Sequence, residues 1–210
     1  AASGALRRSL TGHTGWIQAV AISPDSTWLA TAGDDCTVRI WDAASGALRR
    51  SLTGHKDHVR AVAIAPDGMW LATAGDDRTV RIWDAASGAQ RRSLTGNTSQ
   101  VYAMAISPDG TWLATAGLGD AVRTWDTASG AQRHSLADRQ GWVHAVAIAP
   151  DGTWLAIATN DGTVAIWDGR SDRAHAAMRM DQLAQTSAWT LDSKSVFVGG
   201  TRGLCLFDLR

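Results

Sequence analysis

Two short stretches of this sequence carry residue types and spacings that could do chemistry. His55, Asp57 and His58 lie within four positions and could offer nitrogen and oxygen ligands to a metal ion. Gly117-Leu118-Gly119 is a GxG step of the kind found in phosphate-binding loops. A phosphate loop needs a helix after it, and no helical period follows Gly119. Phosphate binding is therefore not expected, and the metal hypothesis depends on what else holds His55.

The elements that position these residues repeat along the chain. A Trp-Asp pair recurs every 42 residues, and a weaker Phe-Asp copy follows 40 residues after the last pair: Trp41-Asp42, Trp83-Asp84, Trp125-Asp126, Trp167-Asp168 and Phe207-Asp208. A period near forty residues is typical of propeller and solenoid architectures. The fold should therefore be an array of similar units.

Within one unit the local pattern is that of β-strands and turns. Residues 16–22 alternate apolar and polar, and Pro24 favours a turn directly after them. Residues 27–32 and 37–41 are short apolar strands, and Gly46 allows a turn before a fourth strand at 47–52. No stretch has the period of an amphipathic helix. Each unit should hold four strands.

These motifs resemble the WD-repeat (WD40) family of β-propellers over essentially the whole chain. The matching features are Gly12-His13 and Gly54-His55, the SPDG-type turns, the LATAGDD segments and the closing Trp-Asp pairs. The resemblance implies an all-β fold, a β-propeller of four-stranded antiparallel blades, standing alone or as part of a larger, seven-bladed ring. We expect one domain over residues 1–210, with repeats at about 1–42, 43–84, 85–126, 127–168 and 169–210.

The first ten residues, Ala1–Leu10, are identical to Ala43–Leu52, which follow a Trp-Asp pair. By the resemblance they form an outer strand whose own inner three strands lie elsewhere. The segment could pair with residues 204–209 and close the ring, or a further repeat could precede it in a longer chain. The absence of an initiator methionine favours the second explanation, although both can hold.

In the WD-repeat family a His, a Ser or Thr, an Asp and the Trp link the strands of a blade by hydrogen bonds. By position, the resemblance implies two such tetrads: His13, Thr31, Asp35 and Trp41, then His55, Thr73, Asp77 and Trp83. A His–Asp–Thr set could also be a catalytic triad. The set recurs in each blade, its Thr lies within a strand and no oxyanion donor accompanies it, so we expect a structural role. Assigning His55 to the tetrad also argues against the metal site, and we expect no metal and no cofactor.

The tetrad becomes less complete along the chain. In the third unit Asn97 replaces the His and Gly119 takes the Asp position, with Asp120 displaced by one. In the fourth, Arg139 and Ile157 replace the His and the Thr. The fifth unit keeps little beyond Phe207-Asp208.

The first two units differ at nine positions, and five of these are consecutive, residues 14–18 against 56–60. This segment enters the innermost strand from the face of the Asp-containing turns, which commonly binds partners in the family. Neutral drift in a permissive loop would also explain the variation. Aromatic, Arg and His side chains are typical of interfaces, however. We therefore predict a partner-binding surface made by Trp16, Gln18, His58, Arg60, Gln100, Tyr102, Trp142 and His144, with Leu183 and Gln185 as a fifth pair.

Composition narrows the class of partner. Lys plus Arg equals Asp plus Glu at 20 each, and no apolar run is long enough to cross a bilayer. We therefore expect a protein or peptide partner, no specific nucleic acid and no membrane. The predicted function is a non-catalytic interaction scaffold, or a sensor or regulatory module of a longer chain with upstream domains or repeats.

Two alternative functions are an enzyme and a polyanion-binding surface. An active site in the propeller channel needs carboxylates or His at inward positions, where the innermost strands offer mainly Ala, Val and Ile. The Arg pairs at 7–8, 49–50 and 91–92 could bind a polyanion, although a solvated outer edge is the simpler explanation.

The Ala- and Arg-rich composition and the near-identical repeats resemble bacterial multidomain signalling proteins. Cys36 and Cys205 lie at non-equivalent repeat positions, which argues against a disulfide and favours a reducing compartment. We therefore expect a bacterial, cytoplasmic protein.

Overall fold

The computed structural model describes residues 4–119, 122–136, 142–171 and 173–209, and every helix or strand within them is a β-strand. The strands form five antiparallel sheets, four with four strands and the last with three. This confirms the all-β class. None of the described residues forms a helix that could cross a membrane.

We number the sheets as blades 1 to 5 in chain order. Blade 1 holds β1 (Ile17–Ile22), β2 (Trp28–Gly33), β3 (Thr37–Asp42) and β4 (Leu48–Thr53). Blade 2 holds β5 (Val59–Ile64), β6 (Trp70–Gly75), β7 (Val80–Asp84) and β8 (Gln90–Leu94). Blade 3 holds β9 (Val101–Ile106), β10 (Trp112–Gly117), β11 (Val122–Asp126) and β12 (Gln132–Leu136). Blade 4 holds β13 (Val143–Ile148), β14 (Trp154–Thr159), β15 (Thr163–Asp168) and β16 (Ala174–Arg179), and blade 5 holds β17 (Ala184–Trp189), β18 (Ser195–Gly200) and β19 (Gly203–Asp208).

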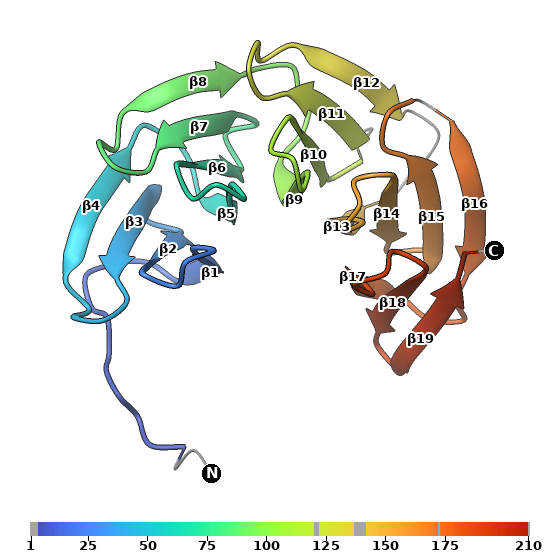
Figure 1. Ribbon diagram of the computed structural model, residues 1–210, viewed down its shortest axis with the longest axis horizontal. Helices are drawn as coiled ribbons and strands as arrows, with labels where there is room; N and C mark the ends of the chain where they lie inside the picture. The colour runs from blue at the N-terminus through green and yellow to red at the C-terminus, as the bar shows by residue number, and fades with distance from the viewer. Residues whose placement is uncertain (1–3, 120–121, 137–141, 172, 210) are drawn as a thin grey trace.

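The blades stand side by side around an open arc (Figure 1). In each blade the strands pair in sequence order, so the first strand lies innermost and the fourth lies at the outer margin. The loop into each first strand and the turn between the second and third strands lie at one edge of the blade. The surface predicted to bind partners is therefore built from one recurring position in neighbouring blades.

The core lies between blades, because each sheet is apolar on both faces. Small side chains on one face of blade 1, such as Ala30 and Ala32, pack against Val59, Leu71 and Trp83 of blade 2. The same arrangement recurs between blades 2 and 3 and between blades 3 and 4. A blade thus completes its core only by contact with its neighbours.

The two ends of the arc differ from the interior. Residues 4–10 form no strand, and β19 ends a sheet with no fourth strand. The first ten residues were expected to form an outer strand, and in their described part this prediction is wrong. Residues 4–10 do not pair with residues 204–209, and a gap separates the two ends of the arc (Figure 1).

Candidate functional site: the rim of the innermost strands

The tetrad side chains of blade 1 form a continuous hydrogen-bond chain that links β3 and β2 to the loop before β1 and to the turn between β2 and β3. The Trp41 indole Nε1–H donates to Thr31 Oγ1 at 2.8 Å, and Thr31 Oγ1 lies 2.8 Å from His13 Nε2. His13 Nδ1 lies 2.9 Å from Asp35 Oδ2. A carboxylate only accepts, so Nδ1 carries the proton. Blade 2 repeats these contacts with Trp83, Thr73, His55 and Asp77.

This geometry gives the Thr hydroxyl no catalytic freedom. Thr31 is buried, and its oxygen already contacts both the Trp and the His side chains. Burial would raise the pKa of Asp35, but hydrogen bonds from Thr37, Thr14 and His13 outweigh it and lower the pKa from 3.8 to about 2. The carboxylate is thus held ionised by groups of its own blade. The set fastens strands together rather than activating a nucleophile.

The tetrad weakens in the third and fourth blades. Thr115 Oγ1 reaches Asn97 Oδ1 at 3.4 Å, and Trp125 Nε1 still donates to Thr115. In blade 4, Asp161 accepts from Thr159 and Thr163 within the same blade. Asp120 and Arg139, the displaced acid and the replacement for the His, lie outside the described residues.

We use the word rim for the surface made by the eight predicted partner-binding residues, Trp16, Gln18, His58, Arg60, Gln100, Tyr102, Trp142 and His144. In blades 1 and 2 the structure joins several of them through two carboxylates. Gln18 Nε2 donates to Asp34 at 2.9 Å. Arg60 donates to Asp76 through Nε and Nη2, and its Nη1 reaches Asp34 of blade 1 at 3.4 Å. The network therefore crosses from one blade to the next.

The Arg60 side chain is fixed by hydrogen bonds to Asp76 and His58. The Asp76 carboxylate is buried, and hydrogen bonding to it raises the pKa of Arg60, so the guanidinium stays charged. Arg60 Nη2 also donates to His58 Nδ1 at 3.0 Å. The Arg60 side chain therefore positions the rim and neutralises Asp76.

The rim also carries exposed aromatic side chains, and that of Tyr102 lies beside this network. The Tyr102 ring stands 5.9 Å from the Arg60 guanidinium carbon, a cation–π arrangement, and its hydroxyl donates to Gln100 Oε1. The rings of Trp142 and His144 of blade 4 have their centroids 6.4 Å apart and their planes tilted by 59°. Trp16, Tyr102 and Trp142 are all exposed. Hydrogen bonds and the cation–π contact thus join Gln18, His58, Arg60, Gln100 and Tyr102 across blades 1 to 3. Trp142 and His144 form an aromatic pair in blade 4.

Sequence reasoning missed the two carboxylates that organise the rim, Asp34 and Asp76. Each directly precedes a tetrad Asp in the repeated GDD segment. The doubled Asp was a usable signal, because only one of the two is needed by the tetrad. Blade 3 has Leu118 at this position and blade 4 has Asn160, whose side chain accepts from the backbone N–H of Trp142.

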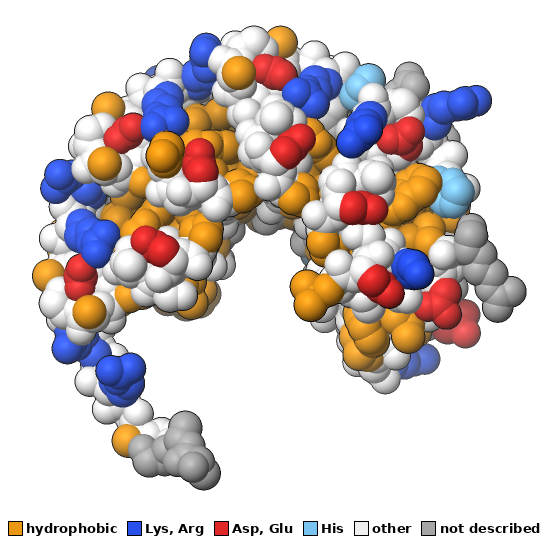
Figure 2. Space-filling view, in the orientation of Figure 1, with side chains coloured by type: hydrophobic (Ala, Val, Ile, Leu, Met, Phe, Trp, Pro, Cys, Tyr) orange, Lys and Arg blue, Asp and Glu red, His pale blue; other side chains and the backbone are white. Residues whose placement is uncertain are grey.

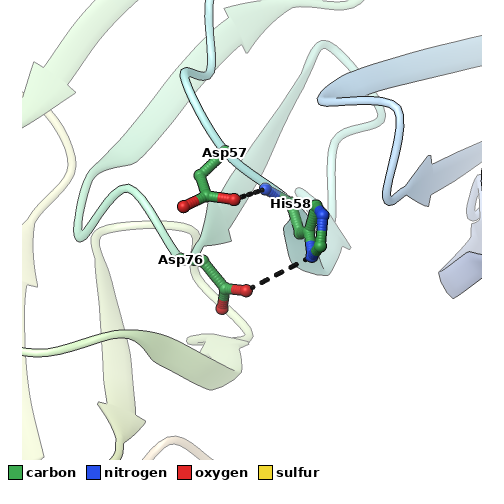
Figure 3. Close-up of side chains that lie close together, drawn as sticks. All are labelled: Asp57, His58 and Asp76. Carbon is green, nitrogen blue, oxygen red and sulfur yellow. Dashed lines mark hydrogen bonds and ion pairs between the residues drawn. The ribbon is translucent and has the colours of Figure 1, made fainter.

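A cluster of possible metal ligands also lies at the rim. Oxygen and nitrogen atoms of Asp57, His58 and Asp76 lie within 4.8 Å of one another (Figure 3). His55, the other histidine of the metal hypothesis, is turned into the tetrad. Because Arg60 already occupies Asp76 and the His58 Nδ1 lone pair, a metal ion would have to displace a bound cation. The cluster is better explained as part of the Arg60 network.

The outer Arg residues are partly committed within the chain. Arg49, Arg91 and Arg133 pair with Asp42, Asp84 and Asp126 at 2.6–2.7 Å. Their Nη2 atoms also donate to backbone carbonyls of residues 27, 69 and 111. Blue and red side chains accordingly interleave along the outer margin (Figure 2). This arrangement does not favour the polyanion alternative.

Comparisons with known proteins agree with the repeat. The family model described as "WD domain, G-beta repeat" matches residues 4–42, 46–84, 88–126 and 130–168. The pre-mRNA-splicing factor PRP46 of Eremothecium gossypii is 47% identical over 38 residues, 18% of this chain and 9% of that protein. The ribosome biogenesis protein erb1 of Botryotinia fuckeliana is 58% identical over 31 residues, covering 15% and 4%. The nuclear distribution protein PAC1 of Arthroderma otae is 51% identical over 35 residues, covering 17% and 8%.

These relatives correct one prediction. They come from fungi, which contradicts the expected bacterial origin, and the resemblance to bacterial multidomain signalling proteins is not supported. The expected cytoplasmic location stays a prediction. Each match covers less than a tenth of the relative's length.

Proposed function

The chain belongs to the WD40 repeat family, and from this premise we propose that it is a non-catalytic scaffold that binds a protein or peptide through the rim. The family match covers the four blades that supply the rim. None of the three relatives' names denotes a catalytic activity, which supports a binding role.

The observation that carries this proposal is the Gln18–Asp34–Arg60–Asp76 network with the Tyr102 ring beside it. Side chains held by neighbours lose little conformational freedom on binding, so they make efficient contact surfaces. Trp16, Tyr102 and Trp142 supply exposed rings of the type that forms interface hot spots. The network would orient the partner while the rings supply the buried apolar area.

The proposed partner class follows from the composition of the rim. Two carboxylates and one guanidinium offer both acceptors and donors, with no excess of positive charge for a polyanion. A polypeptide segment with an apolar anchor and a polar or basic flank fits this surface. The predicted upstream domains or repeats stay a separate prediction.

Replacing Trp16, Tyr102 and Trp142 by Ala tests the proposal. Arg60 is left unchanged, because its removal would leave Asp76 buried without a cation. Lysate of the source cells is passed over wild-type and variant protein, and captured proteins are compared by mass spectrometry. We expect the variant to lose at least one protein that the wild type retains, because loss of an aromatic anchor typically costs about 2 kcal/mol or more.

Met69 and Leu191 provide the matched control. Both are exposed apolar side chains in turns at the opposite edge of the blades. Their double Ala variant should capture the same proteins as the wild type. Retention of every partner by the rim variant, or loss of partners only in the control, would show that the rim is not the binding surface.

A further inference from the structure

The outer strand of blade 1 carries a serine in a basic segment. In β4, Ser51 directly follows Arg49 and Arg50. The next residue, Leu52, is buried with Val38 in the core between blades 1 and 2. Because side chains alternate along a strand, Ser51 lies on the opposite face, and it is exposed. Its hydroxyl is therefore open to solvent, and no hydrogen bond from another described residue holds it.

The exposure of Ser51 does not come from the place of blade 1 at the start of the array. Ser93 and Ser135 hold the same position in β8 and β12, each with a preceding blade beside it, and both are exposed. β4 is also the outermost strand of its sheet, so among the described strands only β3 pairs with it (Figure 1). An enzyme can therefore reach Ser51 within an already extended segment.

Arg39 lies directly across from Ser51. The two residues are partners in the register of β3 and β4. Directly opposed residues share a face of the sheet and have their Cβ atoms about 4.5–5.5 Å apart. Within the described part of the chain the Arg39 guanidinium makes no hydrogen bond or ion pair, and its Nε is buried without an acceptor. A buried donor without an acceptor is costly, so an anion beside Arg39 would be stabilised.

The equivalent arginine of blade 2 finds its acceptors within its own blade. Arg81 Nη1 donates to Gln90 Oε1 at 2.6 Å, and Arg81 Nη2 lies 3.9 Å from Asp77. Blade 1 has Leu48 at the position of Gln90. Arg81 thus needs no acceptor from the preceding blade, and the lack of an acceptor at Arg39 reflects the leucine at position 48.

We propose that Ser51 is a phosphorylation site and that the phosphoserine pairs with Arg39. Two arginines directly before the acceptor form a charge pattern of the kind that protein kinases read in their substrates. The Ser51 oxygen attacks the γ-phosphorus of a nucleoside triphosphate, and a new O–P bond forms. The bond between that phosphorus and the β-phosphate oxygen breaks, the nucleoside diphosphate leaves, and the hydroxyl proton passes to a base of the kinase.

The charges around Ser51 favour Arg39 as the partner of the phosphate. Phosphoserine carries about −1.5 to −2 charges at neutral pH and three strong acceptor oxygens, which form charge-assisted hydrogen bonds with arginine. Arg49 is already paired with Asp42 at 2.6 Å, and Arg50 Nη1 donates to the Arg49 carbonyl at 2.8 Å. Of these three arginines, Arg39 is the one without an acceptor in the described chain. The site lies on an outer strand, so it is separate from the rim of the innermost strands.

Phosphorylation of the folded chain tests whether Ser51 is an acceptor. Wild-type protein, a Ser51→Ala variant and a synthetic peptide of residues 47–54 are incubated with magnesium ATP and protein kinase A, an arginine-directed kinase. Fragment mass spectrometry locates each phosphoryl group, and circular dichroism verifies the fold before and after the reaction. We expect phosphate on Ser51 of the folded wild type and of the peptide. Its absence from Ser51 in either one overturns the proposal.

Ser93 provides the matched control for pairing with Arg39. It lies in the same Arg-Arg-Ser-Leu sequence, opposite Arg81, which already has acceptors. Phosphoserine is placed at position 51 or at position 93, and phosphorus NMR follows the second ionisation of the phosphate, which is near pH 6 in general. Pairing should lower the midpoint at position 51 by about half a pH unit relative to position 93, as expected for an exposed ion pair.

Arg39→Gln should remove this difference, because glutamine carries no charge. Arg78→Gln, which replaces an exposed arginine in the turn between β6 and β7, should leave it unchanged. Equal midpoints for the two phosphoproteins, or a difference that survives Arg39→Gln, would show that the phosphate does not pair with Arg39.

Discussion

At the residue scale, several tight turns depend on a left-handed backbone. Ser26 has a φ of 58°, whereas the equivalent turns of blades 2 to 4 use Gly68, Gly110 and Gly152 at 68–74°. The repeats therefore provide an internal comparison of Ser and Gly in one conformation. A residue with a Cβ is strained there, and glycine is not.

Ser26→Gly should stabilise the protein by about 1 kcal/mol, since the left-handed conformation costs a residue with a Cβ about that much. Gly68→Ser should destabilise it by a similar amount. Urea unfolding of the two variants measures both changes. Equal midpoints for all three proteins would mean that the turn tolerates a side chain without strain.

Asp35→Asn tests the electrostatics of the tetrad. The pKa of Asp35 falls from 3.8 to about 2 on folding, so its ionised form stabilises the fold above pH 3.8. This contribution disappears as the pH drops through about 2. The variant should be less stable at neutral pH and should lose less stability between these two pH values.

The midpoints of urea unfolding, measured for the wild type and Asp35→Asn from neutral pH down to about pH 2, test this prediction. Asp57→Asn is the control, because Asp57 is exposed. If the two variants show the same dependence on pH as the wild type, Asp35 contributes no acid sensitivity.

Residues of the tetrad could be located from the sequence, because each occupies a fixed place in a motif. The organising roles of Asp34 and Asp76 could not, because they depend on Arg60 reaching across to another blade. The contact with Asp76 also gives Arg60 a second role. Its position differs between the repeats, which predicts an interface residue, and in the structure its guanidinium also neutralises the buried Asp76 carboxylate.

At the element scale, strand linkage differs from blade to blade. Trp83 and Trp125 are both buried and both donate to a Thr of the second strand. Behind Trp83, Thr73 lies 2.7 Å from His55 Nε2, whereas Thr115 reaches Asn97 at 3.4 Å. Trp83 and Trp125 are thus equally buried, but the Thr that each contacts has a different second hydrogen bond. Comparing the two Trp residues therefore separates the contribution of packing from that of hydrogen bonding.

Trp83→Ala should therefore cost about 3–5 kcal/mol, as expected for a large buried aromatic side chain. Trp125→Ala should cost about 1 kcal/mol less, the usual net value of a hydrogen bond. Thermal and urea unfolding measure both. In a His55→Asn background, Trp83→Ala should cost no more than Trp125→Ala costs in the wild type. Equal losses for the two single variants would mean that packing alone decides.

The order of the strands could be predicted from the sequence repeat, whereas the structure of the ends of the array could not. Identical letters at Ala1–Leu10 and Ala43–Leu52 predicted two outer strands. Residues 48–53 form an outer strand because they pair with β3. Residues 4–10 do not pair with a strand and form none. Strand formation needs a partner as well as a suitable sequence.

Removing residues 1–10 should leave the melting temperature nearly unchanged in dilute solution, because the described part of this segment, residues 4–10, forms no strand. Differential scanning calorimetry at low protein concentration measures it. A large fall in the melting temperature would mean that the segment stabilises the fold of the single chain, which would contradict this prediction.

At the scale of the whole molecule, the blades form a linear series. Strand pairing occurs within blades, and apolar clusters join each blade to the next. Stability in such an array is the sum of unit and neighbour contributions. Blade 5 lacks a fourth strand and has one covered face, so it should be the least stable unit.

Amide hydrogen exchange should therefore be fastest in β17–β19 and slowest in β5–β7, which lie between covered neighbours. Mass spectrometry of peptic fragments locates the exchange. Uniform protection from blade 1 to blade 5 would mean that the arc unfolds as one cooperative unit.

The linear series of blades has a mechanical consequence. Among the described strands none pairs the first blade with the last, so the arc can open without breaking a sheet when force is applied between the two ends of the chain. Further extension must then peel blades apart, beginning with the three-stranded one. Each of the four blades with 42-residue spacing would release about 140 Å of chain, given roughly 3.4 Å per extended residue. The molecule would lengthen in nearly equal steps, each marking the loss of one blade.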